Sequence, residues 1–317
     1  MASTLPYKFY DQPAEPEDVA AQLIDGLRRD EKRISPKFFY DAKGSQLFAE
    51  ITQTQEYYPT RTEIGLLRMF GGEMARCIGE DCLLVEYGSG SSEKIRILLD
   101  YVKPRIYAPL DISREYLDES ANTIAVDYPW LEVRATCVDY SQEFDLPFSL
   151  IRNTTGFFPG SSIGNFDPDS AMEFLGRVKA QLGHRGGLLI GVDLKKDHQV
   201  LNRAYNDGLG VTAKFNLNAL SHLNQAYEAT FNLDLFEHHA GYNAELGCIQ
   251  MFLESKQDQV ISVAREQFSI KKGERIHTEN SYKYSRDEFA QMAQKAGYQN
   301  CEFWTDDKNW FGIFYLS

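Results

Sequence analysis

The fold is decided by the stretch Cys82-Leu83-Leu84-Val85-Glu86-Tyr87-Gly88-Ser89-Gly90-Ser91-Ser92, where a short apolar run meets a cluster of glycine and serine. An apolar run of this length that stops at such a cluster is typical of a strand buried in a parallel sheet. The glycines allow close approach of the backbone to a ligand, and a helix that starts just after them offers free N–H donors. The stretch therefore predicts a strand and a turn at the ligand-binding edge of a sheet.

Strand-like and helix-like patterns alternate on both sides of this stretch. Helices are predicted over residues 17–33, 62–77, 92–102, 113–127, 169–182 and 286–296, and strands over 82–86, 105–110, 131–138, 155–159, 187–192, 301–304 and 312–316. Strands separated by helices imply right-handed crossovers and a parallel sheet with helices on both faces. We therefore predict an α/β fold.

Two regions stand outside this alternation. The first fifteen or so residues are polar, contain proline and are expected to form an extended arm. Residues from about 196 to 282 are richer in Asn and contain strand-like segments such as 250–253 and 260–263. We interpret this second region as an inserted lobe that joins the N-terminal helices.

Composition narrows the class of protein. The 317 residues include 33 Lys and Arg against 46 Asp and Glu, a net charge of −13, which argues against nucleic acid or an anionic membrane as the main partner. No apolar stretch approaches the roughly 18 residues of a membrane span, and the start resembles no secretory signal. Five scattered cysteines and six histidines show no metal-ligand spacing. We predict a cytoplasmic protein without a metal.

Acidic residues at successive strand ends indicate the kind of ligand. Asp111 lies 23 residues past Gly88 at the end of the next strand and can accept both hydroxyls of a ribose. Asp139 ends the following strand and can accept the amino group of an adenine. Glu93 occupies the third glycine position of the dinucleotide fingerprint, and its carboxylate would repel a pyrophosphate. An acidic pocket without a phosphate-binding turn suits the cationic sulfonium of S-adenosylmethionine, although either aspartate alone can equally be a helix cap or turn residue.

Nine segments of the sequence carry motifs, at residues 36–41, 44–48, 56–63, 86–94, 160–165, 193–197, 203–207, 210–216 and 278–281. They resemble the histidine-specific methyltransferases, which are the L-histidine Nα-methyltransferases of ergothioneine biosynthesis. They follow one another in the family's order over nearly the whole chain. The sequence departs from the family pattern at Tyr87 and Pro159.

The resemblance implies a class I (Rossmann-like) methyltransferase sheet with a second, α+β, substrate-binding lobe. The lobe would comprise residues 1–62 and 194–283, and the methyltransferase domain residues 63–193 and 284–317. The implied cofactor-binding residues are Tyr40, Gly88, Ser89, Gly90, Lys94, Asp111 and Asp139. The implied amino-acid pocket consists of Tyr57, Asn165, Tyr205, Met251, Glu279 and Ser281, with Tyr40 and Tyr57 as the catalytic residues.

These residue types match the implied reaction, trimethylation of the histidine α-amine to hercynine. Asn165 and Tyr205 are neutral donors for the substrate carboxylate, and Glu279 and Ser281 can match the donor and acceptor of the imidazole. Tyr40 and Tyr57 can line the space around the quaternary ammonium with aromatic faces, worth about 0.5–2 kcal/mol each. Methyl transfer itself needs mainly a neutral amine held in line with the methyl group.

Three alternatives stay open at this point. The acceptor can be another amino acid or a small amine. An NAD(P)-dependent oxidoreductase is disfavoured by Glu93, and a non-catalytic scaffold is disfavoured by the complete set of site residues. The expected partners are L-histidine and its mono- and dimethyl forms, with S-adenosyl-L-homocysteine as the second product, and we expect a monomer that binds neither nucleic acid nor membrane.

Overall fold

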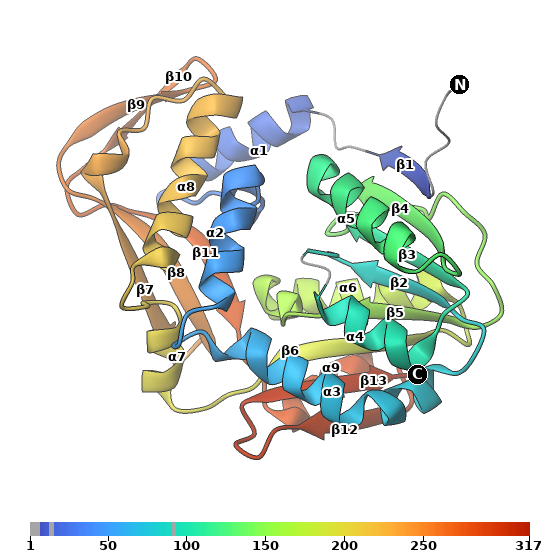
Figure 1. The fold of residues 1–317 in the computed structure, drawn as a ribbon. Helices are drawn as coiled ribbons and strands as arrows, with labels where there is room; N and C mark the ends of the chain where they lie inside the picture. The colour runs from blue at the N-terminus through green and yellow to red at the C-terminus, as the bar shows by residue number, and fades with distance from the viewer. Residues whose placement is uncertain (1–6, 13–15, 91–92) are drawn as a thin grey trace, which may run out of the picture. The chain divides into compact units, whose positions relative to one another are not determined.

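The computed structural model describes residues 7–12, 16–90 and 93–317. The chain divides into two compact units, whose elements are labelled in Figure 1. The first unit contains the N-terminal strand, Pro59–Lys195 and Lys283–Ser317. The second contains the segment from the first helix to Tyr58, together with Lys196–Tyr282.

An eight-stranded sheet forms the centre of the first unit, in the order β1-β4-β3-β2-β5-β6-β13-β12. The strands are Lys8–Gln12 (β1), Leu83–Tyr87 (β2), Ile106–Asp111 (β3), Glu132–Val138 (β4), Thr154–Phe158 (β5), Gly187–Asp193 (β6), Cys301–Thr305 (β12) and Phe311–Leu316 (β13). All pair in parallel except β13, which is antiparallel to both β6 and β12. The chain builds outward on one side of β2 and then crosses to β5 on the other, so the switch point at which such sheets bind ligands lies at the end of β2.

Helices cover both faces of this sheet. They are Tyr58–Ile78 (α3), Glu93–Val102 (α4), Arg114–Asp127 (α5), Pro168–Leu182 (α6) and Arg286–Lys295 (α9), with a short 3₁₀ turn at Ser162–Asn165 (η2). α3, α4 and α5 share one apolar core that includes Leu84 of β2. Side chains alternate along a strand, so Tyr87 points to the opposite face, where its ring packs on Phe174 of α6. The predicted α/β fold is therefore confirmed.

The N-terminal segment differs from its expected role as an extended arm in the substrate lobe. Lys8–Gln12 forms β1 and pairs in parallel with β4 of the main sheet. Without it, β4 would be an edge strand with a row of unpaired N–H and C=O groups. The polar composition that suggests an arm is the ordinary composition of a short edge strand.

The second unit combines helices with two small antiparallel sheets. Its helices are Pro16–Arg28 (α1), Ala42–Thr52 (α2), His198–Ala204 (α7) and Val211–Ala226 (α8), with 3₁₀ turns at Pro36–Phe39 (η1) and Leu233–Leu235 (η3). Its strands are Phe236–Asn243 (β7), Cys248–Ser255 (β8), Gln259–Val263 (β9), Glu266–Ile270 (β10) and Arg275–Tyr282 (β11). One sheet has the order β11-β8-β7, and the other is the β9–β10 hairpin. The strand-like segments expected near residues 250 and 260 are thus strands, whereas α8 was not expected.

Candidate active site

The Gly-rich turn after β2 takes a backbone conformation that favours glycine. Gly88 has φ +74° and Gly90 has φ +40°. The amides of Gly88 and Ser89 both donate to the carbonyl of Leu110, at 2.9 and 3.0 Å, so the turn is fixed to the end of β3. A Cβ on Gly88 would lie 2.9 Å from Tyr140 Oη, hence the turn leaves no room for a side chain at this point.

Asp111 lies directly beside this turn. Its Oδ2 accepts from the amide of Gly90 at 3.2 Å, and its Oδ1 accepts from the amide of Ser113 at 2.9 Å. Burial raises the pKa of Asp111, and the same two amides oppose that rise. A carboxylate has about four acceptor positions, so capacity for hydroxyl donors is left after these two bonds.

Asp139 ends β4, and one of its oxygens is engaged locally. Its Oδ1 accepts from the amide of Ser141 at 3.0 Å and from the Ser141 hydroxyl at 2.6 Å. This is the turn-residue role that was the alternative to adenine binding. The next residue, Tyr140, is the one whose hydroxyl faces Gly88, so the loop after β4 lies against the Gly-rich turn.

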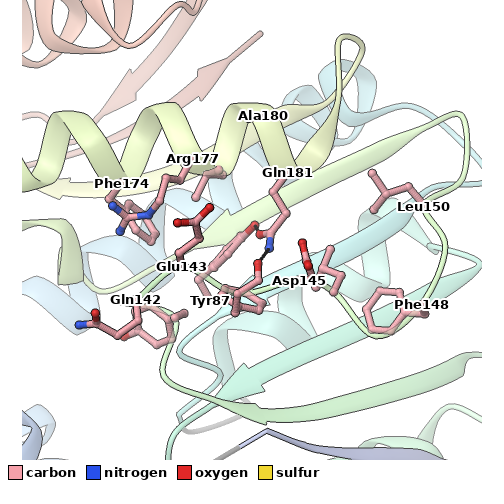
Figure 2. A pocket seen from close by; sticks show the side chains of 14 residues that line it. Tyr87, Gln142, Glu143, Asp145, Phe148, Leu150, Phe174, Arg177, Ala180 and Gln181 are labelled. Carbon is pink, nitrogen blue, oxygen red and sulfur yellow. Dashed lines mark hydrogen bonds between the residues drawn. The ribbon is translucent and has the colours of Figure 1, made fainter. Parts of the chain in front are cut away.

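The loop that carries Asp139 is anchored on α6 around a cavity of about 550 Å³ (Figure 2). Residues 139–153, all described, connect β4 to β5 without a helix or strand. Arg177 donates to the carbonyl of Ser141 at 3.0 Å, and Gln181 donates to that of Phe144 at 3.0 Å. Gln181 also accepts from the hydroxyl of Tyr87 at 2.6 Å. Tyr87, a departure from the family pattern, thus helps to hold this loop.

Glu86 is a buried acid next to the turn. It is 1% exposed, and its carboxyl accepts a hydrogen bond from the hydroxyl of Tyr107. Burial raises the pKa of Glu86 to about 8, against the opposing effects of Tyr107 and Lys94. The carboxyl is therefore largely protonated at neutral pH.

Lys94, implied as a cofactor-binding residue, is held by an ion pair. Its Nζ lies 2.6 Å from Oε2 of Glu63, a side chain with 0% exposure on α3. The same carboxylate accepts from the amide of Gly160 in the loop after β5. Asn165 ends η2 on that loop and is half-buried. Glu63 was not predicted as a site residue, although its spacing from Leu66 and Leu67 places it on the buried face of the helix.

The second unit brings together the remaining predicted residues through an aromatic chain. The ring centroids of Tyr40 and Phe48 lie 6.0 Å apart, those of Phe48 and Tyr57 lie 6.1 Å apart, and those of Tyr57 and Tyr205 lie 6.2 Å apart. Phe215 of α8 also packs on Tyr40. Tyr40, implied as a cofactor residue, therefore belongs to the same unit and the same cluster as Tyr57 and Tyr205 of the implied amino-acid pocket.

Polar groups of the predicted pocket adjoin this cluster. The hydroxyl of Tyr205 donates to Ser281 Oγ at 2.9 Å. Ser281 and Glu279 lie two residues apart on β11, after the irregularity between His277 and Glu279, so their side chains share one face. Glu279 is paired in register with Met251 of β8, and all four of these predicted residues are buried.

Tyr205 is positioned from behind by a histidine. Nε2 of His238 lies 3.0 Å from the carbonyl of Tyr205, and Nδ1 lies 2.8 Å from Nδ2 of Asn216. A carbonyl can only accept and an amide nitrogen can only donate, so the ring carries its proton on Nε2. Burial lowers the pKa of His238, which favours this neutral form.

The described part of the chain holds no group of three or more His, Cys, Asp or Glu side chains arranged for a metal ion. Every helix within it is too short or too polar to cross a bilayer.

Comparison with known proteins decides the family. A family described as "Histidine-specific methyltransferase, SAM-dependent" matches residues 19–317. The chain belongs to this family. It is 38% identical to a histidine N-alpha-methyltransferase of Mycolicibacterium smegmatis over 91% of each chain. It is 37% identical to the protein of that name from Mycobacterium tuberculosis over 92% of each chain. It is also 30% identical to ergothioneine biosynthesis protein 1 of Neurospora crassa, over 90% of this chain and 33% of that protein.

As a member of this family, the histidine-specific methyltransferase uses S-adenosylmethionine, and the first unit has residues that fit it. The backbone of the Gly-rich turn carries no side chain at Gly88, and Asp111 keeps acceptor capacity for ribose hydroxyls beside it. The acidic surroundings suit a sulfonium. The predicted methyltransferase activity, its methyl donor and the class I fold are therefore confirmed.

Proposed function

We propose that this methyltransferase transfers three methyl groups to the α-amino nitrogen of L-histidine and so produces hercynine for ergothioneine biosynthesis. The observation that carries the proposal is the buried set on β11 and β8, with Glu279 opposite Met251 and Ser281 bonded to Tyr205. It is a buried set of side chains with one acid and two hydroxyls, which suits an imidazole. The similarity to relatives named histidine N-alpha-methyltransferase supports the same substrate.

S-adenosylmethionine, when bound, supplies a methyl carbon on a sulfonium whose leaving group is the neutral thioether S-adenosylhomocysteine. Asp111 and the backbone at Gly88 and Gly90 hold the nucleoside, and the glycines allow its close approach. We assign the adenine amino group to Asp139, beside the turn that it makes with Ser141.

Histidine is oriented through its two ends. Asn165 donates to the carboxylate, and Tyr205 donates to it once its single hydroxyl proton turns away from Ser281, whose own hydroxyl can then donate to Tyr205. Both groups are neutral, so they place no negative charge beside the sulfonium. Glu279 and Ser281 bind the imidazole. An amino acid without matching polar atoms would forgo the hydrogen bonds to these buried groups, at a cost of about 1–3 kcal/mol each.

Tyr40 and Tyr57 line the space around the reacting nitrogen. A buried amine loses its proton more readily because burial penalises the ammonium form. The dimethyl form has at most one N–H to donate and the quaternary product has none, whereas aromatic faces can stabilise the final cation. We further propose that the enzyme is cytoplasmic and monomeric and acts on free histidine and on its mono- and dimethyl forms.

A panel of free amino acids and small amines tests the substrate. Each is incubated with enzyme and S-adenosylmethionine, and S-adenosylhomocysteine release is measured together with the mass of the acceptor. Histidine should be the preferred acceptor and should gain three methyl groups. Preference for another amine, with histidine unchanged, would contradict the proposal.

Glu279→Ala tests the pocket. Removing the imidazole partner should lower kcat/KM for histidine by roughly 10²-fold. Glu254→Ala is the matched control, because Glu254 lies in the same sheet but has a partly exposed side chain that bonds Arg275 at 2.8 Å. Equal activity of the two variants would remove Glu279 from the pocket.

A further inference from the structure

Glu63 is a buried acid whose place in the reaction the family pattern does not assign. It lies in the second turn of α3 with a side-chain exposure of 0%. Taking a carboxylate out of water is costly, and an apolar residue in its place would often be at least as stable. The role of an acid at this position is therefore to be found in the groups that its oxygens bind.

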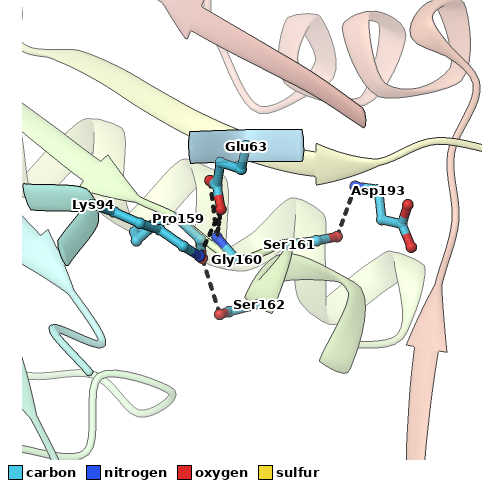
Figure 3. Close-up of polar contacts among 7 residues, drawn as sticks. All are labelled: Glu63, Lys94, Pro159, Gly160, Ser161, Ser162 and Asp193. Carbon is cyan, nitrogen blue, oxygen red and sulfur yellow. Dashed lines mark hydrogen bonds and ion pairs between the residues drawn. The ribbon is translucent and has the colours of Figure 1, made fainter. Parts of the chain in front are cut away.

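Those oxygens hold two segments at the ligand-binding edge of the sheet (Figure 3). Oε1 and Oε2 accept from the amide of Gly160 at 3.0 and 2.9 Å. Oε2 lies 2.6 Å from Nζ of Lys94, in the first turn of the helix that follows the Gly-rich turn. The contacts with Gly160 and with Lys94 are charge-assisted, which makes them stronger and shorter than hydrogen bonds between neutral groups.

β6 is adapted to this carboxylate. A Cβ at Gly191 would lie 2.2 Å from Oε1 of Glu63. Glycine weakens a strand interior, and a glycine there often marks a site where another group approaches closely. The absence of a side chain at Gly191 therefore makes room for the carboxylate of Glu63.

The loop held through Gly160 is fixed at a second point. Gly160 and Ser161 follow one another with φ +80° and +57°, a conformation that needs external bonds to persist in Ser161. Ser161 Oγ accepts from the amide of Asp193 at 2.8 Å. Asp193 is itself paired with Lys283 at 2.9 Å, both with side chains 1% exposed. The loop that ends at Asn165 thus starts from two anchored residues.

We propose that Glu63 is a positioning residue: its carboxylate fixes the Gly160–Asn165 loop and neutralises Lys94 beside the cofactor turn. This rests on the proposed function, in which Asn165 meets the substrate carboxylate. The geometry of the loop then sets how well the amine is aligned. The charge of Glu63 keeps the ammonium of Lys94 from repelling the sulfonium.

The test compares Glu63→Gln with two variants on the same helix. Glu73→Gln makes the same substitution about 15 Å further along α3, where the carboxylate accepts from Trp304 Nε1 at 2.9 Å. Leu67→Ala empties a fully buried core position one turn from Glu63 and destabilises the fold without touching the loop. Thermal unfolding then shows how much of any effect follows from stability alone.

Two readouts separate positioning from structure. Glu63→Gln should lower kcat for histidine by roughly 10–100-fold, as a misplaced acceptor does, while both controls keep the wild-type value. By calorimetry, Glu63→Gln should bind S-adenosylmethionine roughly tenfold more weakly but S-adenosylhomocysteine unchanged, because only the former carries a sulfonium. The double variant Glu63→Gln/Lys94→Met removes the unneutralised ammonium and should restore the ratio of the two affinities.

Glu63→Asp keeps the test valid if Glu63→Gln does not fold. It retains the charge but shortens the reach to Gly160, so it should keep the affinity ratio and lose kcat. A Glu63 variant that behaves like Leu67→Ala, with lower stability, wild-type kcat and an unchanged ratio, would overturn the proposal. The affinity ratio needs no acceptor, so it judges Glu63 even if histidine turns out not to be the substrate.

Discussion

Replacing Glu86 with glutamine should change how the stability of the enzyme depends on pH. Glu86 is buried, and its pKa rises from the ordinary value of 4.5 to about 8. Between these two values the folded protein keeps a proton that the unfolded chain has released. The stability contributed by the protonated form is therefore fully present below pH 4.5 and is lost as the pH rises through 8.

The size of this loss follows from the shift. Because one pKa unit corresponds to about 1.4 kcal/mol, a rise from 4.5 to about 8 makes the wild type lose about 3–4 kcal/mol of unfolding free energy between pH 5 and pH 8 through this residue. Glutamine does not titrate, so Glu86→Gln should lack this component of the slope. A constant offset from altered hydrogen bonding would not affect the difference in slope.

Urea unfolding at pH 5, 6, 7 and 8 measures the two slopes. Tyr107→Phe is the control, since the Tyr107 hydroxyl lowers the pKa of Glu86. Its loss should extend the pH-dependent decline to higher pH. Parallel curves for the wild type and Glu86→Gln would refute the assignment of a protonated Glu86 at neutral pH.

Three further predictions concern the turn and the pocket. Gly88→Ala places a Cβ 2.9 Å from Tyr140 Oη at φ +74° and should weaken S-adenosylhomocysteine binding by roughly tenfold or more in calorimetry, whereas Gly72→Ala, with open space around it, should not. Tyr205→Phe and Ser281→Ala should each raise KM for histidine. A double-mutant cycle in KM should give a coupling energy of about 0.5–1.5 kcal/mol for the 2.9 Å hydrogen bond between the two hydroxyls. Additive effects would show that this bond contributes nothing. Burial lowers the pKa of His238, so its neutral state contributes stability that is fully present above the ordinary pKa of 6.5 and is lost as the pH falls. Asn216→Ala, which removes the donor to Nδ1 of His238, should raise KM for histidine. A wild-type unfolding curve no more acid-sensitive than that of His238→Gln would contradict the role of the ring.

The central strands could be predicted because a strand that is buried on both faces consists largely of apolar residues. β2 and β6 are buried at every position, so each appears in the sequence as a largely apolar run next to a helical pattern. The edge strand β1 has no such run. Its pairing with β4 depends on residues more than a hundred positions away, which no local pattern contains.

α8 was missed because its buried face is partly polar. Asn216 and Asn218 both lie inside the unit, where Asn216 bonds His238 and Asn218 donates to Asp41 at 2.8 Å. Buried amides with specific partners erase the apolar periodicity by which a helix is identified. The asparagines that suggested a strand-rich insertion are instead contacts that hold α8 in place.

The candidate site divides in the same way. Gly88, Asp111 and Asp139 follow from strand ends, and Glu279 and Ser281 required the family resemblance. Glu63 escaped notice because its partners, Lys94 and Gly160, lie on other elements, and only the folded chain shows that one carboxylate serves both.

The position of the transferred methyl groups tests the central claim most directly. Histidine is incubated with the enzyme and S-adenosylmethionine carrying a ¹³C-labelled methyl group, and the product is analysed by mass spectrometry and NMR. The account predicts three labelled methyl groups, all on the α-nitrogen. Label on an imidazole nitrogen would contradict it. So would histidine that stays unlabelled under conditions in which the enzyme methylates another acceptor.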